Sequence, residues 1–166
     1  HLFGLTGPAG TVMLRVGFAA VILVTTQGGL PLRAPRAAYV PAILFGLALA
    51  GMNFAFYSSM ARIPLGIAVS IEFIGPLAVA VAGSRRALDF AWVLLAAVGI
   101  LLFAPVTGAH LDPFGVLLAL AAGVGWASYI VLSARVGREF PGRSGLTFAM
   151  CVAAVVLLPV GIFSAG

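Results

Sequence analysis

Long continuous runs of nonpolar residues, separated by short polar breaks, make up most of this chain. A helix needs about 20 such residues, at about 1.5 Å each, to cross a hydrocarbon layer of roughly 30 Å. The runs are continuous rather than alternating, which favours membrane helices over the strands of a barrel. The sequence therefore predicts an all-α integral membrane protein with about six transmembrane helices. The predicted spans are residues 8–26, 39–61, 64–84, 90–106, 113–135 and 145–163.

The arginines in the breaks between these runs predict the orientation of the helices. The second and fourth breaks carry one arginine, Arg62, whereas the first, third and fifth carry seven. These seven are Arg33, Arg36, Arg85, Arg86, Arg135, Arg138 and Arg143. Because cytoplasmic loops are enriched in Lys and Arg, we expect the odd-numbered breaks in the cytoplasm. The first helix then runs from outside to inside, and we expect at least one helix before it in the complete protein.

Composition supports a membrane protein and argues against other classes. The chain is 63% hydrophobic and 8% charged, with a mean hydropathy of +1.21, far from the values of a soluble domain. Its net charge of +5 comes from loop arginines, so we do not expect nucleic-acid binding. The single cysteine, Cys151, has neither a disulfide partner nor a metal-binding set around it. No HExxH, GxSxG or phosphate-loop motif is present, and we expect no enzyme activity, cofactor or metal.

The ends of the sequence suggest an internal piece of a longer protein. The chain starts at His1, with no signal-peptide features before the first nonpolar run, and stops at Gly166 just after the last one. Residues 18–24, FAAVILV, weakly match residues 152–158, VAAVVLL. These two segments lie five spans apart and cross in opposite directions, an offset that inverted repeats of five helices would produce.

Two charged side chains, Arg15 and Glu72, lie well inside the predicted spans, away from their ends. A charge at mid-membrane costs at least about 2.5 kcal/mol, so such residues usually face a protein interior or a cavity. By the helical rise, both lie roughly 10 to 12 Å from the outer boundary, and Asn53 reaches a similar depth. Tyr57 follows Asn53 by one turn on the same face. We therefore predict that Arg15, Asn53, Tyr57 and Glu72 line one polar patch in the outer half of the membrane, which is the candidate functional site.

The role of Glu72 stays open among three interpretations: a structural partner of Arg15, a substrate ligand, or a group that takes up and releases a proton. Arg15 could also extend its long side chain to the outer interface. Gly75 and Pro76, next to Glu72, would leave backbone carbonyl groups free for a ligand or allow a bend, so we include both in the candidate site.

The fifth span carries small residues at four-residue spacing, which would let another helix approach closely. This stripe consists of Gly115, Ala119, Gly123 and Ala127. Trp126 and Tyr129 near the middle of the span are further candidates for lining a cavity, although both residue types also serve in packing and at membrane interfaces.

The stretch from Gly51 to Arg86 contains three adjoining motifs, GMNFAFY, PLGIAV and EFIGPLAVA. They are followed by SRRALDFAWVLLAAVGI and, in the fifth span, by GVGWASYIVLSARVG. On these residues the chain closely resembles the EamA-type transporters of the drug/metabolite transporter (DMT) superfamily, and within them the inner-membrane threonine/homoserine exporters. The resemblance extends across nearly the whole chain.

The resemblance implies a ten-helix fold made of two inverted repeats of five helices. Residues 1–108 would be most of the first repeat, lacking its first helix, and residues 109–166 the start of a truncated second repeat. It also implies a multi-pass protein of the bacterial inner membrane. Its partners would be the lipid bilayer, a small amino acid or related metabolite, and protons. Export would follow alternating access around a midplane cavity.

Two rival functions stay open. One is a DMT exporter of another small metabolite or drug, including a nucleotide-sugar-like or purine solute. The other, from a different class, is a membrane scaffold or intramembrane enzyme that transports nothing. A scaffold needs no polar patch at depth, and an enzyme needs a catalytic pair facing one cavity.

Overall fold

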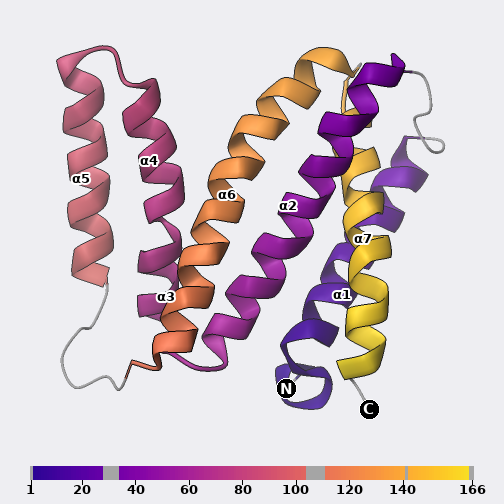
Figure 1. Cartoon of the computed structure of the whole chain (residues 1–166), viewed down its shortest axis with the longest axis horizontal. Helices are drawn as coiled ribbons and strands as arrows, with labels where there is room; N and C mark the ends of the chain where they lie inside the picture. The colour runs from indigo at the N-terminus through magenta and orange to yellow at the C-terminus, as the bar shows by residue number, and fades with distance from the viewer. Residues whose placement is uncertain (1, 28–33, 104–110, 141, 165–166) are drawn as a thin grey trace.

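The computed structural model describes residues 2–27, 34–103, 111–140 and 142–164, and this part of the chain is helical without any strand. Seven helices follow one another along the chain (Figure 1). They are α1 (Leu2–Thr26), α2 (Arg36–Met60), α3 (Leu65–Glu72), α4 (Ile74–Gly83), α5 (Ala87–Phe103), α6 (Pro113–Glu139) and α7 (Ser144–Ser164). The prediction of an all-α protein is confirmed.

Helices α3 and α4 are two halves of one predicted span, separated at Phe73. Pro76 has no backbone N–H, so it cannot donate to the carbonyl group of Glu72 four residues earlier. The interruption is short, because the Phe73 N–H still donates to Val69 and the Leu77 N–H to the Phe73 carbonyl, at 3.0 and 3.1 Å. The break therefore lies directly beside the Glu72 carboxylate.

Side chains near the helix starts explain where α5 and α6 begin. Asp112 caps α6 by accepting a hydrogen bond of 3.0 Å from the Phe114 N–H, and Pro113 occupies the first turn, where no N–H is needed. Asp89, in the first turn of α5, accepts from the backbone N–H groups of Arg85 and Arg86, each at 3.0 Å. Both acidic residues also lie at the positive end of the helix dipole.

Successive spans run in opposite directions (Figure 1). The start of α2, the α4–α5 connection and the residues between α6 and α7 share one end of the molecule, which we call the arginine-rich end. Of the seven arginines predicted there, six are described and Arg33 lies outside the described residues. Arg62 lies at the opposite end, where it pairs with Asp112 at 3.1 Å.

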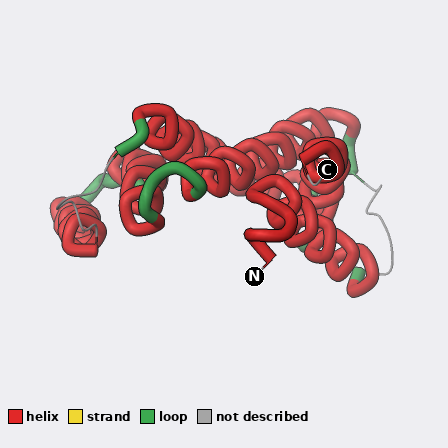
Figure 2. Tube along the Cα trace, turned by 90° about the horizontal axis from the view of Figure 1, so that it is seen from below, coloured by secondary structure: helices red, strands yellow, loops and turns green. Residues whose placement is uncertain are grey.

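The helices spread along one direction rather than forming a round bundle, as the end-on view shows (Figure 2). Helix α2 packs against both α6 and α7, and α1 packs mainly on α7, which runs the opposite way. Helix α5 lies at one edge, where its contacts among the described residues are with α3 and α4. Helices α2 and α6 therefore form the centre that positions the other spans.

Length and nonpolar composition qualify four helical segments as membrane spans: residues 36–60, 65–83, 113–139 and 144–162. Two further nonpolar helices in the described residues, 10–26 and 87–100, are shorter. Large nonpolar side chains point outward, among them Phe18, Trp92 and Leu102, the last with 83% of its surface exposed. A nonpolar exterior suits a hydrocarbon surrounding, and the chain is a multi-pass membrane protein.

The small-residue stripe of α6 packs against α3 and the end of α2, as predicted. Ala119 is fully buried in a cluster with Ile63, Ile67 and Ala68. A methyl group built on Gly75 would overlap the backbone carbonyl of Gly123, so α4 and α6 cross with their backbones in contact. This close approach places the helix break at Phe73 against the middle of α6.

Candidate functional site

Arg15 of α1 reaches across to α2, where it contacts two of the predicted site residues. Its Nη2 donates to Oδ1 of Asn53 at 2.5 Å, and its Nη1 donates to the hydroxyl of Tyr57 at 3.2 Å. The guanidinium carbon also lies 5.6 Å from the centre of the Tyr57 ring, within the range of a cation–π contact. Asn53 is buried and its Nδ2 donates to the Leu49 carbonyl at 2.8 Å, which fixes its oxygen toward Arg15.

Glu72 ends α3 and is buried, with 7% of its surface exposed. Its carboxylate makes no hydrogen bond or ion pair within the described part of the chain. In particular, the Glu72 carboxylate does not lie within 4.0 Å of the Arg15 guanidinium, the limit for an ion pair. The two residues therefore do not form the structural ion pair that is one of the three interpretations of Glu72. Glu72 instead lines a cavity.

That cavity has a volume of about 240 Å³, and all four residues of the predicted patch line it. We call it the polar cavity. Its lining consists of Arg15, Met52, Asn53, Phe56, Tyr57, Glu72 and Trp126. The structure thus brings Arg15, Asn53, Tyr57 and Glu72 to one place from three different helices, together with Trp126 from a fourth.

The nonpolar wall of the cavity contains two residues that sequence reasoning missed, Met52 and Phe56. They are four positions apart on α2, so they lie on one helix face, next to the face of Asn53 and Tyr57. Trp126 completes this wall and contacts Phe73 edge to face, with ring centres 5.0 Å apart. Because Phe73 marks the α3–α4 break, Trp126 links the cavity wall to the one interruption described within a span.

Three of the predicted residues do not line the polar cavity. Gly75 is buried against α6 and Pro76 is half-buried, and both shape the break that follows Glu72. They position the carboxylate rather than face the cavity, because the helix interruption and the contact with Gly123 turn this part of the span toward α6. Tyr129 lines a different cavity, nearer the arginine-rich end.

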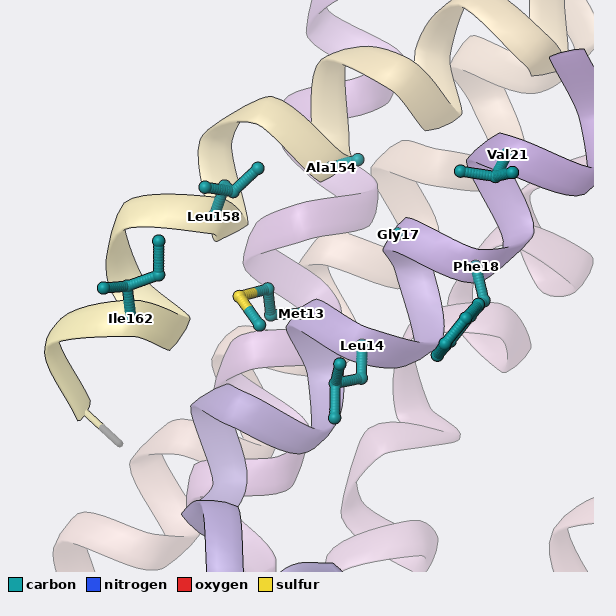
Figure 3. Close-up of a pocket in the computed structure, with 8 residues that line it drawn as sticks. All are labelled: Met13, Leu14, Gly17, Phe18, Val21, Ala154, Leu158 and Ile162. Atoms are coloured by element: carbon teal, nitrogen blue, oxygen red, sulfur yellow. The ribbon is translucent and has the colours of Figure 1, made fainter. Parts of the chain in front are cut away.

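Another cavity, of about 320 Å³, lies between α1 and α7 and is lined by nonpolar residues, including Met13, Phe18 and Leu158 (Figure 3). It offers no charged or hydrogen-bonding side chain. A polar solute therefore finds complementary groups in the polar cavity and none here.

The chain matches threonine/homoserine exporter RhtA of Salmonella typhimurium with 41% identity and that of Escherichia coli with 40% identity. Each match covers 99% of this chain and 56% of the relative. Over almost its whole length, the chain is a homologue of these exporters. No family model and no solved structure matches it.

The homologues bear out the prediction of a transport protein rather than an enzyme. With the nonpolar helices, they also support a multi-pass location in the bacterial inner membrane. The chain spans little more than half the length of the relatives it matches.

Proposed function

We propose that the full-length protein to which this chain belongs exports small amino acids, such as threonine or homoserine, and that the polar cavity binds them. The observation that carries the proposal is the pair of opposite charges on the cavity lining, Arg15 and Glu72, which are not joined in an ion pair. A zwitterionic amino acid carries the complementary ammonium and carboxylate groups. The similarity to threonine/homoserine exporters supports the proposal.

Arg15 has hydrogen-bonding capacity left for a carboxylate. The guanidinium has five N–H donors, and Asn53 and Tyr57 occupy two of its nitrogens once each. These two contacts hold the guanidinium at the cavity wall, so little of its flexibility is lost when a ligand binds. The substrate carboxylate would bind Arg15, and its ammonium group would bind Glu72.

The size of the cavity favours a small solute. Its volume of about 240 Å³ lies below the roughly 300 to 1,000 Å³ of sites for drug-sized ligands. Met52, Phe56 and Trp126 would contact the nonpolar part of the substrate. A nucleotide-sugar-like solute would need more space than this arrangement provides.

The proposed mechanism is alternating access with proton coupling. The break at Phe73 allows the two halves of the α3–α4 span to change their relative angle, because no main-chain hydrogen bond joins Glu72 to Pro76. Glu72 would bind either the substrate ammonium or a proton, and this competition would couple the two fluxes. The ten-helix, two-repeat architecture implied by the EamA resemblance supplies the second half of the pathway in this proposal.

The test is transport by the full-length protein in proteoliposomes of controlled orientation, with a panel of solutes. We expect flux of threonine and homoserine and a dependence on the proton gradient. Transport of a purine, a drug or another metabolite in place of the amino acids would contradict the substrate proposal. No flux of any solute would favour the scaffold interpretation.

A further inference from the structure

A second cavity with polar groups lies at the arginine-rich end, between α2, α6 and the start of α7. Its volume is about 250 Å³, and its lining includes Phe45, Tyr129, Ser133 and Arg143. Arginines at this end are predicted to face the cytoplasm. An exported solute would therefore meet this cavity before it reaches the polar cavity.

The polar groups of this second cavity are available to a ligand. The Arg143 guanidinium and the Tyr129 hydroxyl make no hydrogen bond or ion pair with another described residue, whereas the neighbouring Arg135 pairs with Glu139 at 3.5 Å. Ser133 donates to the Ile130 carbonyl at 2.9 Å and keeps its oxygen as an acceptor. The cavity thus offers two hydroxyl groups and one cation that has no partner in the part of the chain that the structure describes.

Two aromatic rings lie between the two cavities. Tyr129 follows Trp126, which lines the polar cavity, by three residues on α6, a distance of roughly 5 Å by the helical rise. The Tyr129 ring packs on Phe45 of α2 with centres 4.9 Å apart. Tyr129 also contacts both neighbouring nonpolar clusters, one around Val16 and Leu49 and one around Phe45. The Phe45–Tyr129 contact therefore separates the cavities along the α2–α6 interface.

We propose that this second cavity is a vestibule that binds the carboxylate of a small amino acid through Arg143 before the solute passes Phe45 and Tyr129 to the polar cavity. The inference rests on the proposed export function and adds a first binding step to it. Arg143 is exposed, so its attraction acts on solutes arriving from solution. Separation of the two rings would then open the path inward.

The test compares Arg143→Gln with Arg138→Gln in the full-length protein, measuring the KM and maximal rate of threonine uptake from each face of oriented vesicles. Arg138 is exposed at the same end and makes no ion pair with a described residue, but it does not line the vestibule. It therefore controls for general charge and for membrane orientation.

We expect Arg143→Gln to raise the KM from the arginine-rich face by at least about tenfold, the size of effect that loss of one charge-assisted hydrogen bond produces. The maximal rate of uptake from the arginine-rich face should stay within about twofold, and the KM from the opposite face should change less than the KM from the arginine-rich face. Arg143→Lys, which keeps the charge, should recover part of the loss, and Arg138→Gln should match the unsubstituted protein.

Equal effects of the two Gln variants, or an equal rise in KM at both faces, would overturn the vestibule while leaving the proposed function intact. Absence of amino-acid flux in the unsubstituted protein would overturn both.

Discussion

Arg15 and Glu72 show how two charges can line one cavity between membrane helices without being joined to each other. Arg15 is held at the cavity wall by Asn53 and Tyr57, whereas the Glu72 carboxylate faces the polar cavity without a partner among the described residues. Burying a carboxylate without a protein partner costs free energy. The position of Glu72 is therefore best explained by a group that enters the cavity and binds the carboxylate. In the proposed mechanism, the substrate ammonium or a proton is this group.

Replacing Glu72 by Gln keeps the shape of the side chain and removes its charge. We expect the export rate of the full-length protein to fall by at least about tenfold, because a charge-assisted hydrogen bond to the ammonium is lost, and the pH dependence of export to flatten. The measurement is threonine efflux from proteoliposomes across a pH series.

Glu139→Gln is the matched control, since Glu139 pairs with Arg135 outside the polar cavity and should leave export unchanged. A Glu72→Gln variant that keeps both the rate and the pH dependence of the unsubstituted protein would remove Glu72 from the mechanism.

The depth of the site residues could be predicted from the sequence, whereas their rotation about the helix axis could not. Counting residues from the span ends places Arg15, Asn53 and Glu72 at one level, because the helical rise is constant. Which face of the span turns toward α6 depends on contacts that are distant in sequence. For this reason the sequence places Gly75 in the candidate site although it packs on Gly123, and it does not predict that Met52 lines the cavity.

At the scale of the helices, the crossing of α4 and α6 depends on the absence of a side chain at Gly75. We expect Gly75→Ala to lower the stability of the folded protein by about 1 to 3 kcal/mol, the usual cost of overpacking, since the added methyl group would meet backbone atoms that cannot rotate away. This loss of stability should appear as a thermal unfolding temperature in detergent that is lower than that of the unsubstituted protein.

Gly51→Ala on α2 provides the comparison, because no heavy atom lies within 4 Å of the added methyl group. Alanine within a helix is about 0.5 to 1 kcal/mol more favourable than glycine, so this variant should be neutral or more stable. Equal unfolding temperatures for the two variants would contradict the close crossing.

The contact between the end of α2 and the start of α6 is expected to depend on pH. The hydrogen bond from Arg62, with that from the Phe114 N–H, holds the pKa of Asp112 below its ordinary value of 3.8. A carboxyl group whose pKa is lowered by folding stabilises the folded protein at any pH above its ordinary pKa. This contribution is lost as the pH falls through the lowered pKa.

Asp112→Asn keeps a capping oxygen for α6 but removes the ion pair. The variant should therefore unfold at a slightly lower temperature than the unsubstituted protein at pH 7, and the difference should vanish in acid. A difference that grows as the pH falls below 3.8 would contradict this assignment.

Helix boundaries extend beyond the nonpolar runs that predicted them. Helix α2 starts at Arg36 rather than residue 39, and α6 continues to Glu139 rather than ending at residue 135. Nonpolar length indicates the membrane-spanning part, but polar residues continue a helix outside it, as the i,i+4 pair of Arg135 and Glu139 illustrates. The break near Gly75-Pro76 could be expected, because proline removes a main-chain donor.

For the whole molecule, the sequence predicts antiparallel neighbours along the chain but not which distant helices meet. The packing of α1 on α7 and of α2 on α6 joins segments far apart in sequence, and nonpolar patterns carry no information on such pairing. The polar cavity depends on this arrangement, because α1, α2, α3 and α6 each contribute to it.

Orientation is a prediction at this scale and can be tested with cysteine labelling. In a full-length Cys151→Ala background, Ala61→Cys and Ala87→Cys place thiols at exposed positions on opposite ends of the molecule without removing an arginine. We expect a membrane-impermeant thiol reagent to label Ala61→Cys in intact cells and to label Ala87→Cys after permeabilisation, because the arginine-rich end is predicted to face the cytoplasm. Labelling of Ala87→Cys in intact cells would reverse the assignment.

Binding of threonine and two analogues to the full-length protein, measured by calorimetry, tests the role of the polar cavity most directly. One analogue carries a methyl ester in place of the carboxylate, and the other lacks the ammonium group. If Arg15 and Glu72 bind the two ends of the solute, each analogue should bind at least about tenfold more weakly than threonine, and Glu72→Gln should abolish the difference between threonine and the analogue without ammonium. Equal affinity for all three solutes would contradict the assignment of the cavity as a site for zwitterionic amino acids.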